Sequence, residues 1–209
     1  MEIIFAVTTI AILVFSAILH EIAHGYVADR FGDPTARLAG RLTLNPKPHI
    51  DPMMSILLPL ILILSGSPVI FGAAKPVPID PFNLKEGLKD IALVSLAGPL
   101  TNVIIAVIAA IIFHVLLPIF GQSIIIAILG KIVEINLILA IFNLLPIPPL
   151  DGSKVFSLLL PKNMANAYLS LSSVGFLILI FLLFFPIGGF SILRFMGTLI
   201  TFSLRLLGL

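Results

Sequence analysis

Two histidines and a glutamate lie inside the first long apolar stretch of this chain. His20, Glu21 and His24 form the pattern His-Glu-x-x-His. On an α-helix, residues four apart lie one above the other on the same face, so both imidazoles can bind one metal ion. Glu21, between them, can then reach a metal-bound water. The pattern predicts a hydrolytic zinc site.

The alternative interpretation is that these three side chains are buried polar groups that satisfy one another between helices. Ionisable side chains are costly at membrane depth and are rare there without a function. Three of them within about one helical turn pack poorly, so a metal site is the favoured interpretation.

The composition places this site in a membrane. The chain has 209 residues, of which 59% are hydrophobic and 11% are charged. A soluble domain is roughly 45–50% apolar and about 25% charged. The absence of cysteine excludes thiolate metal ligands and disulfides. A net charge of only +2 does not suggest a nucleic-acid partner.

The apolar stretches predict an all-α, polytopic membrane protein that forms one domain over residues 1–209. Spanning helices need about 20 apolar residues. The spans are expected at about Ile3–Ala28, Ile91–Leu117, Ile124–Leu145, Tyr168–Phe185 and Ser191–Leu207. Residues 3–152 form the expected catalytic core, and the two spans within 168–207 are peripheral.

Two smaller elements are expected between the first and second spans. Alternating apolar residues within Asp29–Asp51 predict a small membrane-associated β element, a strand or hairpin over Ala36, Leu38, Gly40, Leu42 and Leu44. Pro52–Leu64 is apolar but too short to cross, because its helix covers only about 20 Å of the roughly 30 Å hydrocarbon core. It is therefore expected to form a re-entrant or interfacial hairpin.

Asp151 is the candidate for the third metal ligand, because catalytic zinc usually has three protein ligands. It follows the run Asn143-Leu144-Leu145-Pro146-Ile147-Pro148-Pro149-Leu150, whose prolines must end a helix. Non-helical backbone at membrane depth is tolerated where it is buried in protein or lines a wet cavity. A second interpretation, compatible with the first, is that Asp151 caps a short helix at Gly152–Leu160.

If His20, His24 and Asp151 bind one ion, the directions of the spans are determined. Each ligand lies at the C-terminal end of its span, so the first span and Ile124–Leu145 must run parallel, with Ile91–Leu117 antiparallel between them. Nine of the twelve basic residues then lie on one side: Arg30, Arg37, Arg41, Lys47, Lys75, Lys85, Lys89, Lys154 and Lys162. Positive charge favours the cytoplasm, so the site is expected near the cytoplasmic side.

The motifs together resemble the site-2 protease family of intramembrane zinc metalloproteases. The matching segments are HEIAH in one span, AGPLTN at the start of a middle span and NLLPIPPLDG at the end of a later one. Their order is that of the family's three-span catalytic core, and they cover about two-thirds of the chain. The chain resembles a compact form without inserted PDZ-like or CBS-like modules.

The resemblance implies a role for each candidate residue. His20, His24 and Asp151 would bind one Zn²⁺ per chain, and Glu21 would be the general base. Asn143 matches a family asparagine proposed to hydrogen-bond the substrate or stabilise the oxyanion. The alternative for Asn143 is a hydrogen bond at a helix C-terminus or between helices.

The resemblance also implies partners and location. The substrate would be a transmembrane protein, unwound and cut within the lipid bilayer, with the segment before AGPLTN forming a sheet that aligns it. Independently of the resemblance, the small size and the many lipid-facing positions suit a multi-pass protein of a prokaryotic plasma membrane. The oligomeric state is not predicted.

Three other functions stay open. A metal-binding transporter would also have broken helices and buried carboxylates, but inverted repeats are missing. A non-catalytic zinc-binding scaffold would not need Glu21. A different peptidase would take a glutamate as third ligand, and the later glutamates, Glu86 and Glu134, lie in unsuitable places.

Several further residues have structural interpretations. Gly98 and Asn102 are expected to serve helix packing. Lys131 and Glu134, three residues apart, are expected to pair. The lone histidines, His49 and His114, are expected to be structural.

Overall fold

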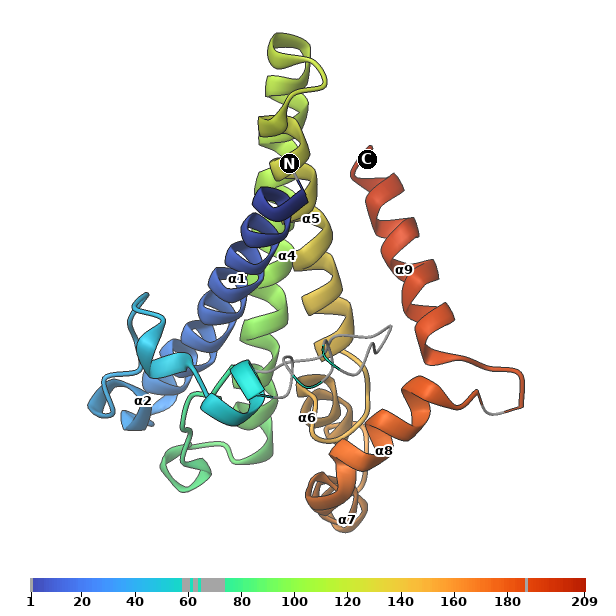
Figure 1. Ribbon diagram of the computed structural model, residues 1–209. Helices are drawn as coiled ribbons and strands as arrows, with labels where there is room; N and C mark the ends of the chain where they lie inside the picture. Colours follow the sequence, from blue (N-terminus) through green and yellow to red (C-terminus); the bar gives the residue numbers. More distant parts are fainter. Residues whose placement is uncertain (1, 58–60, 62–63, 65–73, 187) are drawn as a thin grey trace.

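Three long helices form the centre of the molecule. Figure 1 shows the computed structural model, which describes residues 2–57, 61, 64, 74–186 and 188–209. The long helices are α1 (Glu2–Phe31), α4 (Leu88–Phe120) and α5 (Ile124–Asn143). Helix α4 packs against both others and runs antiparallel to them, so α1 and α5 run parallel (Figure 1). This is the arrangement predicted from the positions of the three ligands.

These three helices are long and apolar enough to cross a membrane, over Val7–Phe31, Leu88–Phe120 and Ile124–Asn143. At about 1.5 Å per residue, the shortest of them still covers the roughly 30 Å hydrocarbon core. The protein is therefore a multi-pass integral membrane protein, and its described residues are predominantly helical.

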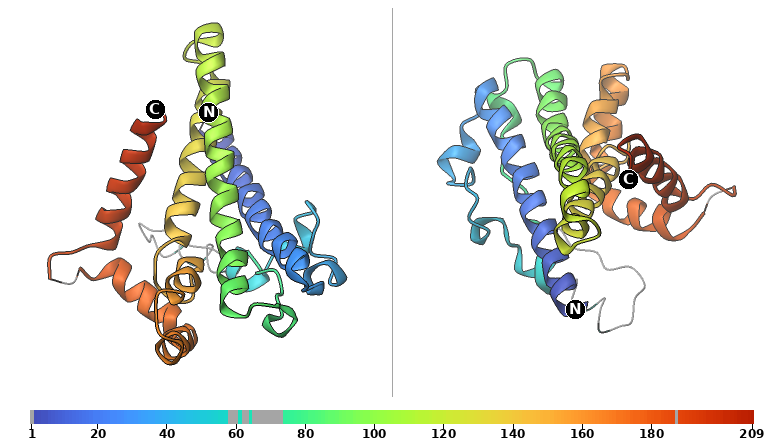
Figure 2. Two further views of the ribbon diagram at one scale, coloured as in Figure 1. Left: turned by 180° about the vertical axis from the view of Figure 1, so that it is seen from behind. Right: turned by 90° about the horizontal axis from the view of Figure 1, so that it is seen from above.

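Shorter elements connect and flank the long helices. Between α1 and α4 lie α2 (Thr35–Leu38), η1 (Lys47–His49), η2 (Pro52–Leu57) and η3 (Pro81–Asn83). After α5 come α6 (Asp151–Ser157), α7 (Lys162–Ser170), α8 (Ser172–Phe184) and α9 (Ile192–Leu206). Helix α9 packs on α5, on the side away from α1 (Figure 2).

Small residues let the central helices approach closely. Ala106, Ala109 and Ala110 of α4 are buried against Val133 and Leu137 of α5. Membrane helices associate through such small-residue contacts, because lipid provides no hydrophobic driving force between them. The α4–α5 pair is thus the packed centre that supports the site.

A second apolar cluster connects the C-terminal helices to the centre. It consists of Leu145, Leu150, Leu179, Ile192 and Met196. These residues come from the segment between α5 and α6, from α8 and from α9. The cluster therefore attaches the C-terminal helices to the segment that leads to Asp151.

The predicted strand over residues 36–44 is wrong. Thr35–Leu38 form helix α2, and Gly40 follows with a positive φ of 65°. A strand would place Ala36 and Leu38 on one face, but Ala36 is 0% exposed and Leu38 is 76% exposed. Asp33 accepts a hydrogen bond from the backbone N–H of Thr35, and such local side-chain bonds favour turns and helix starts over strands.

The predicted peripheral spans also differ from the structure. The expected span Tyr168–Phe185 is divided between α7 and α8, whose axes meet at 69°, so the pair is a broken span or a re-entrant loop. Helix α9 has 15 residues, fewer than the about 20 that a span needs.

The re-entrant hairpin predicted at Pro52–Leu64 lies partly outside the described residues, which omit 58–60 and 62–63. Within it, Pro52–Leu57 form η2, a π-helix. The α7–α8 pair is the described element with the geometry expected of a re-entrant segment. The short helix predicted at Gly152–Leu160 is confirmed in kind as α6, which begins one residue earlier, at Asp151.

Candidate metal centre

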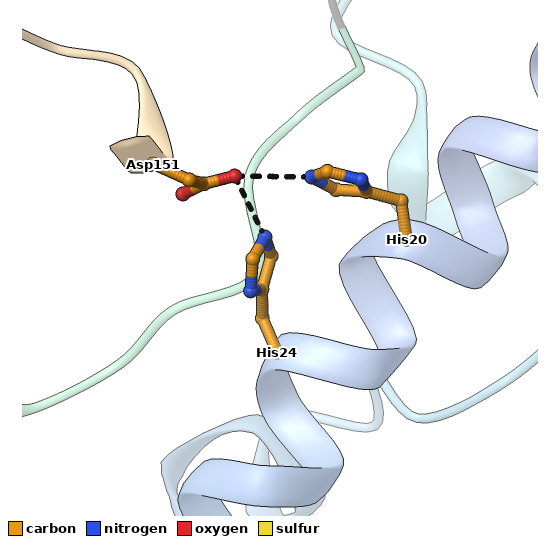
Figure 3. Close-up of side chains that lie close together, drawn as sticks. All are labelled: His20, His24 and Asp151. Atoms are coloured by element: carbon orange, nitrogen blue, oxygen red, sulfur yellow. Dashed lines mark hydrogen bonds and ion pairs between the residues drawn. The ribbon is translucent and has the colours of Figure 1, made fainter. Parts of the chain in front are cut away.

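The structure brings together the three residues that the sequence predicts as metal ligands. His20 and His24 project from one face of α1, and Asp151 is the first residue of α6 (Figure 3). The Nε2 atoms of His20 and His24 each lie 3.1 Å from Oδ2 of Asp151. Residues 127 and 131 positions apart in the chain thus meet at one point.

The spacing of the donor atoms suits a tetrahedral ion. Zinc bonds of about 2.0–2.1 Å separate two tetrahedral ligands by roughly 3.3 Å. The observed separations between each Nε2 and Oδ2 are 3.1 Å, and one ligand atom from each residue lies within 4.8 Å of the others. His20 and His24 are each 6% exposed and Asp151 is 9% exposed. Two imidazoles and one carboxylate form a donor set that zinc prefers.

Asp151 reaches the histidines because α6 starts directly against the end of α5. A Cβ on Gly152 would lie 2.1 Å from the carbonyl oxygen of Leu144 and 2.6 Å from that of Leu145. Only glycine permits this approach. Leu150, rather than Asp151, is at the N-cap position, and the capping interpretation of Asp151 is therefore wrong.

The carboxylate of Asp151 has two different neighbours. Its Oδ2 faces the histidines, and its Oδ1 lies 3.3 Å from Nζ of Lys154, one turn further along α6. The ammonium group of Lys154 therefore contacts the carboxylate oxygen that faces away from the histidines.

Gly98 of α4 leaves the space in front of both imidazoles. A Cβ at this position would lie 2.5 Å from Nε2 of His20 and 2.5 Å from Nε2 of His24. The sequence suggested only close helix packing for Gly98. The structure shows that any side chain there would enter the space between the ligand atoms.

The outer nitrogen of each histidine has a hydrogen-bond partner. Nδ1 of His24 lies 2.7 Å from the carbonyl oxygen of Val94. A carbonyl can only accept, so Nδ1 carries the hydrogen and the lone pair of Nε2 faces the site. Nδ1 of His20 lies 2.5 Å from Oδ1 of Asn102.

Glu21 has its hydrogen-bond partner outside the helices. Its Oε2 accepts a hydrogen bond of 2.7 Å from the backbone N–H of Val77. Val77 lies in an irregular segment, residues 75–80, which we call the strap. Because Pro76 and Pro78 have no N–H, Val77 provides the only backbone donor in this part of the strap.

The N-terminal end of the strap is held by a buried arginine and a backbone contact. Nη2 of Arg41 donates to the carbonyl oxygens of Lys75, at 2.7 Å, and Pro76, at 3.2 Å. Arg41 is 7% exposed. The backbone N–H of Lys75 donates to the carbonyl of His49 at 2.8 Å.

The C-terminal end of the strap is held by Asp33, just beyond α1. Asp33 accepts from the backbone N–H of Asp80 at 2.7 Å and from Nδ2 of Asn83 at 3.0 Å. Burial raises the pKa of Asp33, but the hydrogen bonds from Thr35, Asn83 and Asp80 outweigh burial and lower the pKa below its ordinary value.

Asn143 is the last residue of α5, and its Nδ2 donates to the carbonyl of Leu139 at 3.0 Å. This is the helix C-terminal bond considered as the alternative. In the described part of the chain no hydrogen bond joins Asn143 to the three ligands, so its role in catalysis stays a prediction.

Other sequence-based interpretations concern structural contacts. Lys131 donates to Glu134 at 2.5 Å, as predicted. Nε2 of His49 contacts the carbonyl of Thr43, and Nε2 of His114 contacts the carbonyl of Leu207. Both histidines therefore make structural contacts.

Sequence reasoning missed several groups around the site. The sequence predicts only a packing role for Asn102, and it predicts no role at the site for Asn136, Val77 or Lys154. For Asn102 and Asn136, the signal in the sequence is a polar side chain within an apolar span. Val77 and Lys154 have no such signal.

Comparison with known proteins identifies the family. The profile of Peptidase family M50 matches residues 118–186, which include Asn143 and Asp151. "Putative zinc metalloprotease YwhC" of Bacillus subtilis is 37% identical over 185 residues, covering 85% of this chain and 80% of the relative. The chain belongs to peptidase family M50, the site-2 protease family.

A second relative extends this result for the M50 protein. "Putative zinc metalloprotease Rip2" of Mycolicibacterium smegmatis is 33% identical over 184 residues, covering 86% of this chain and 68% of the relative. No solved structure matches the chain. The protein is a membrane metalloprotease with a site suited to zinc.

Proposed function

We propose that this M50 protein is an intramembrane zinc endopeptidase that hydrolyses peptide bonds in or near transmembrane helices of membrane proteins. The observation that supports this most is the convergence of His20, His24 and Asp151 from two separate elements, at the level of the membrane-spanning helices. One Zn²⁺ per chain would be held by these three residues.

Each residue of the site has a role in the proposed reaction. A bound zinc ion supplies Lewis acidity that polarises the scissile carbonyl and lowers the pKa of water. Glu21 takes the proton from the attacking water and passes it to the leaving amine, a contribution of about 10²–10⁴ in rate. Asn143 donates one hydrogen of its side-chain NH₂ group to the developing oxyanion, while the other is held by the carbonyl of Leu139.

Positioning of Glu21 supports its role as the base. The hydrogen bond from Val77 engages Oε2, which leaves the other carboxylate oxygen to accept a proton. The strap that provides this bond is itself held at both ends, by Arg41 and by Asp33.

The distribution of charge supports a site near the cytoplasmic side of a prokaryotic plasma membrane. Residues 32–57 and 74–87, the adjoining ends of α1 and α4, and helices α6 and α7 lie at one end of the bundle (Figure 1) and carry the nine basic residues named above. Basic loops favour the cytoplasm. The substrate would reach the site from the bilayer and must be unwound before cleavage, because helical peptide groups are already hydrogen-bonded.

The test is cleavage of a tagged transmembrane protein by the purified enzyme. Glu21→Gln is expected to keep the zinc content and to lower the cleavage rate by about 10²–10⁴. Asp151→Ala is expected to lose both zinc and cleavage. Glu86→Gln, the same change at an exposed position outside the site, is the matched control.

The outcomes separate the proposed enzyme from the alternatives. A transporter or a zinc-binding scaffold would bind zinc through the same residues but would cleave nothing in any variant. Unchanged cleavage by Glu21→Gln with zinc still bound would show that another group is the base.

A further inference from the structure

A chain of buried side-chain amides leads from His20 through the centre of the bundle. Asn102 of α4 and Asn136 of α5 are both 0% exposed, and Ser16 of α1 is 5% exposed. Nδ2 of Asn102 donates to Oδ1 of Asn136 at 2.9 Å. Nδ2 of Asn136 donates to Oγ of Ser16 at 3.0 Å and to the carbonyl of Ile132 at 2.9 Å. The chain thus joins all three spanning helices.

The direction of the hydrogen bonds in this chain follows from two backbone carbonyls, that of Ile132 and that of Ser16, which accepts from Nδ2 of Asn102 at 3.5 Å. The carbonyl of Ile132 can only accept, so the NH₂ group of Asn136 must face it. Oδ1 of Asn136 then faces Asn102 and accepts from its NH₂ group. Oδ1 of Asn102 is therefore left for His20, where it accepts from Nδ1.

The direction of these hydrogen bonds determines the state of Nε2 of His20, the nitrogen that faces the metal site. With its hydrogen on Nδ1, His20 presents the lone pair of Nε2 to Asp151 and to the space in front of Gly98. His24 reaches the same state more simply, through the carbonyl of Val94. Since a histidine binds metal through a nitrogen without hydrogen, the tautomer decides whether the ligand is ready.

We propose that Asn102, oriented by Asn136, is a positioning residue that holds His20 in the metal-binding tautomer and ring orientation. The inference rests on the zinc site of the proposed function and adds residues to it. Packing alone would not need these groups, because an apolar side chain of similar size fills the same space without needing hydrogen-bond partners.

The experiment measures zinc affinity by competition with a chelator in the purified full-length protein. Asn102→Leu removes the acceptor for Nδ1 of His20, and zinc affinity is expected to fall about 10–100-fold. Asn102→Asp keeps the acceptor but loses the donor to Asn136. Its zinc affinity is expected to stay close to that of the unaltered protein, although the zinc-free protein should be less stable.

Two further variants complete the design. Asn163→Leu makes the same replacement at an exposed position on α7, and its zinc affinity is expected to be unchanged. Asn136→Leu removes the shorter of the two hydrogen bonds that orient the amide of Asn102 and leaves the longer one, to the carbonyl of Ser16, so zinc affinity should fall by a smaller factor than in Asn102→Leu. This variant also decides the question should Asn102→Leu fail to fold.

The following results would contradict the inference. Unchanged zinc affinity in folded Asn102→Leu or, in its place, Asn136→Leu would overturn the inference. Equal losses in Asn102→Leu and Asn102→Asp would overturn it too, because the acceptor would then not matter. Absence of zinc binding by the unaltered protein would end the proposed function together with the inference, whereas equal affinities across the variants would end the inference alone.

Discussion

The two sides of α1 around the His-Glu-x-x-His pattern are held in different ways. On the histidine side, the partners come from helices: Val94 and Asn102 of α4, and Asp151 of α6. On the glutamate side, the partner is a backbone N–H in the strap, which is neither helix nor strand. One short segment of sequence is therefore supported by the packed bundle on one face and by a loop on the other.

The difference separates two functions. Changes among the helical contacts should act on metal binding, because they move or block the ligands. Changes in the strap should act on the rate at unchanged metal content, because they move only Glu21. The following variants test whether the two sides are independent.

The largest effect is expected on the histidine side, from Gly98→Ala. The added methyl group would lie 2.5 Å from both Nε2 atoms, so zinc binding and cleavage should both be lost. Overpacking of this kind typically costs about 1–3 kcal/mol in stability as well. Zinc content, measured by elemental analysis of the purified protein, checks the prediction.

Gly130→Ala is the matched control for that variant. Its added methyl group would lie 3.8 Å from the nearest side-chain atom, an ordinary contact. It should retain zinc, and a Gly98→Ala protein with full zinc content would refute the proposed crowding of the ligands.

On the glutamate side, Val77→Pro removes the N–H that contacts Glu21. A hydrogen bond to a charged group is worth about 1.5–3 kcal/mol, so kcat should fall about tenfold or more while zinc content and KM stay close to those of the unaltered protein. Val77→Ala keeps the N–H and should retain most of the rate. A loss of zinc in Val77→Pro would show that the two sides are coupled.

A smaller effect is expected from Asp33→Asn, which weakens the C-terminal anchor of the strap. Because its hydrogen bonds lower the pKa of folded Asp33 below the ordinary value of 3.8, its ionised form stabilises the fold above that pH. This stabilisation is lost as the pH falls through the lower folded pKa. The Tm difference between the two proteins should therefore be largest near neutral pH and shrink below about pH 3.8. A difference independent of pH would contradict this.

The smallest effect is expected on the histidine side from Lys154→Met. The lysine side chain is 37% exposed, and partly exposed ion pairs are worth about 0.2–1 kcal/mol. Zinc affinity should therefore fall less than about fivefold, as measured by chelator competition. A loss as large as that expected for Asn102→Leu would mean that the orientation of Asp151 depends on this ion pair.

Two kinds of residue could be identified from sequence: those whose signal lies in neighbouring residues, and those whose polar side chains are rare in lipid. His20 and His24 share a helix face through spacing alone, and Asp151 was indicated by the prolines that precede it. The antiparallel placement of α4 followed from requiring these ligands at one depth. In contrast, the alternation at Ala36–Leu44 misled, because Asp33 and the positive φ of Gly40 favour a helix and a turn.

The sequence by itself determined the membrane environment, the three spanning helices and the type of ligands, because hydrophobicity and helical periodicity are properties of neighbouring residues. Only the tertiary structure decided that Gly98 must have no side chain, that Glu21 contacts the strap and that Asn102 accepts from His20. These facts depend on contacts between residues tens of positions apart in the chain, and no local pattern encodes which atoms meet when helices pack.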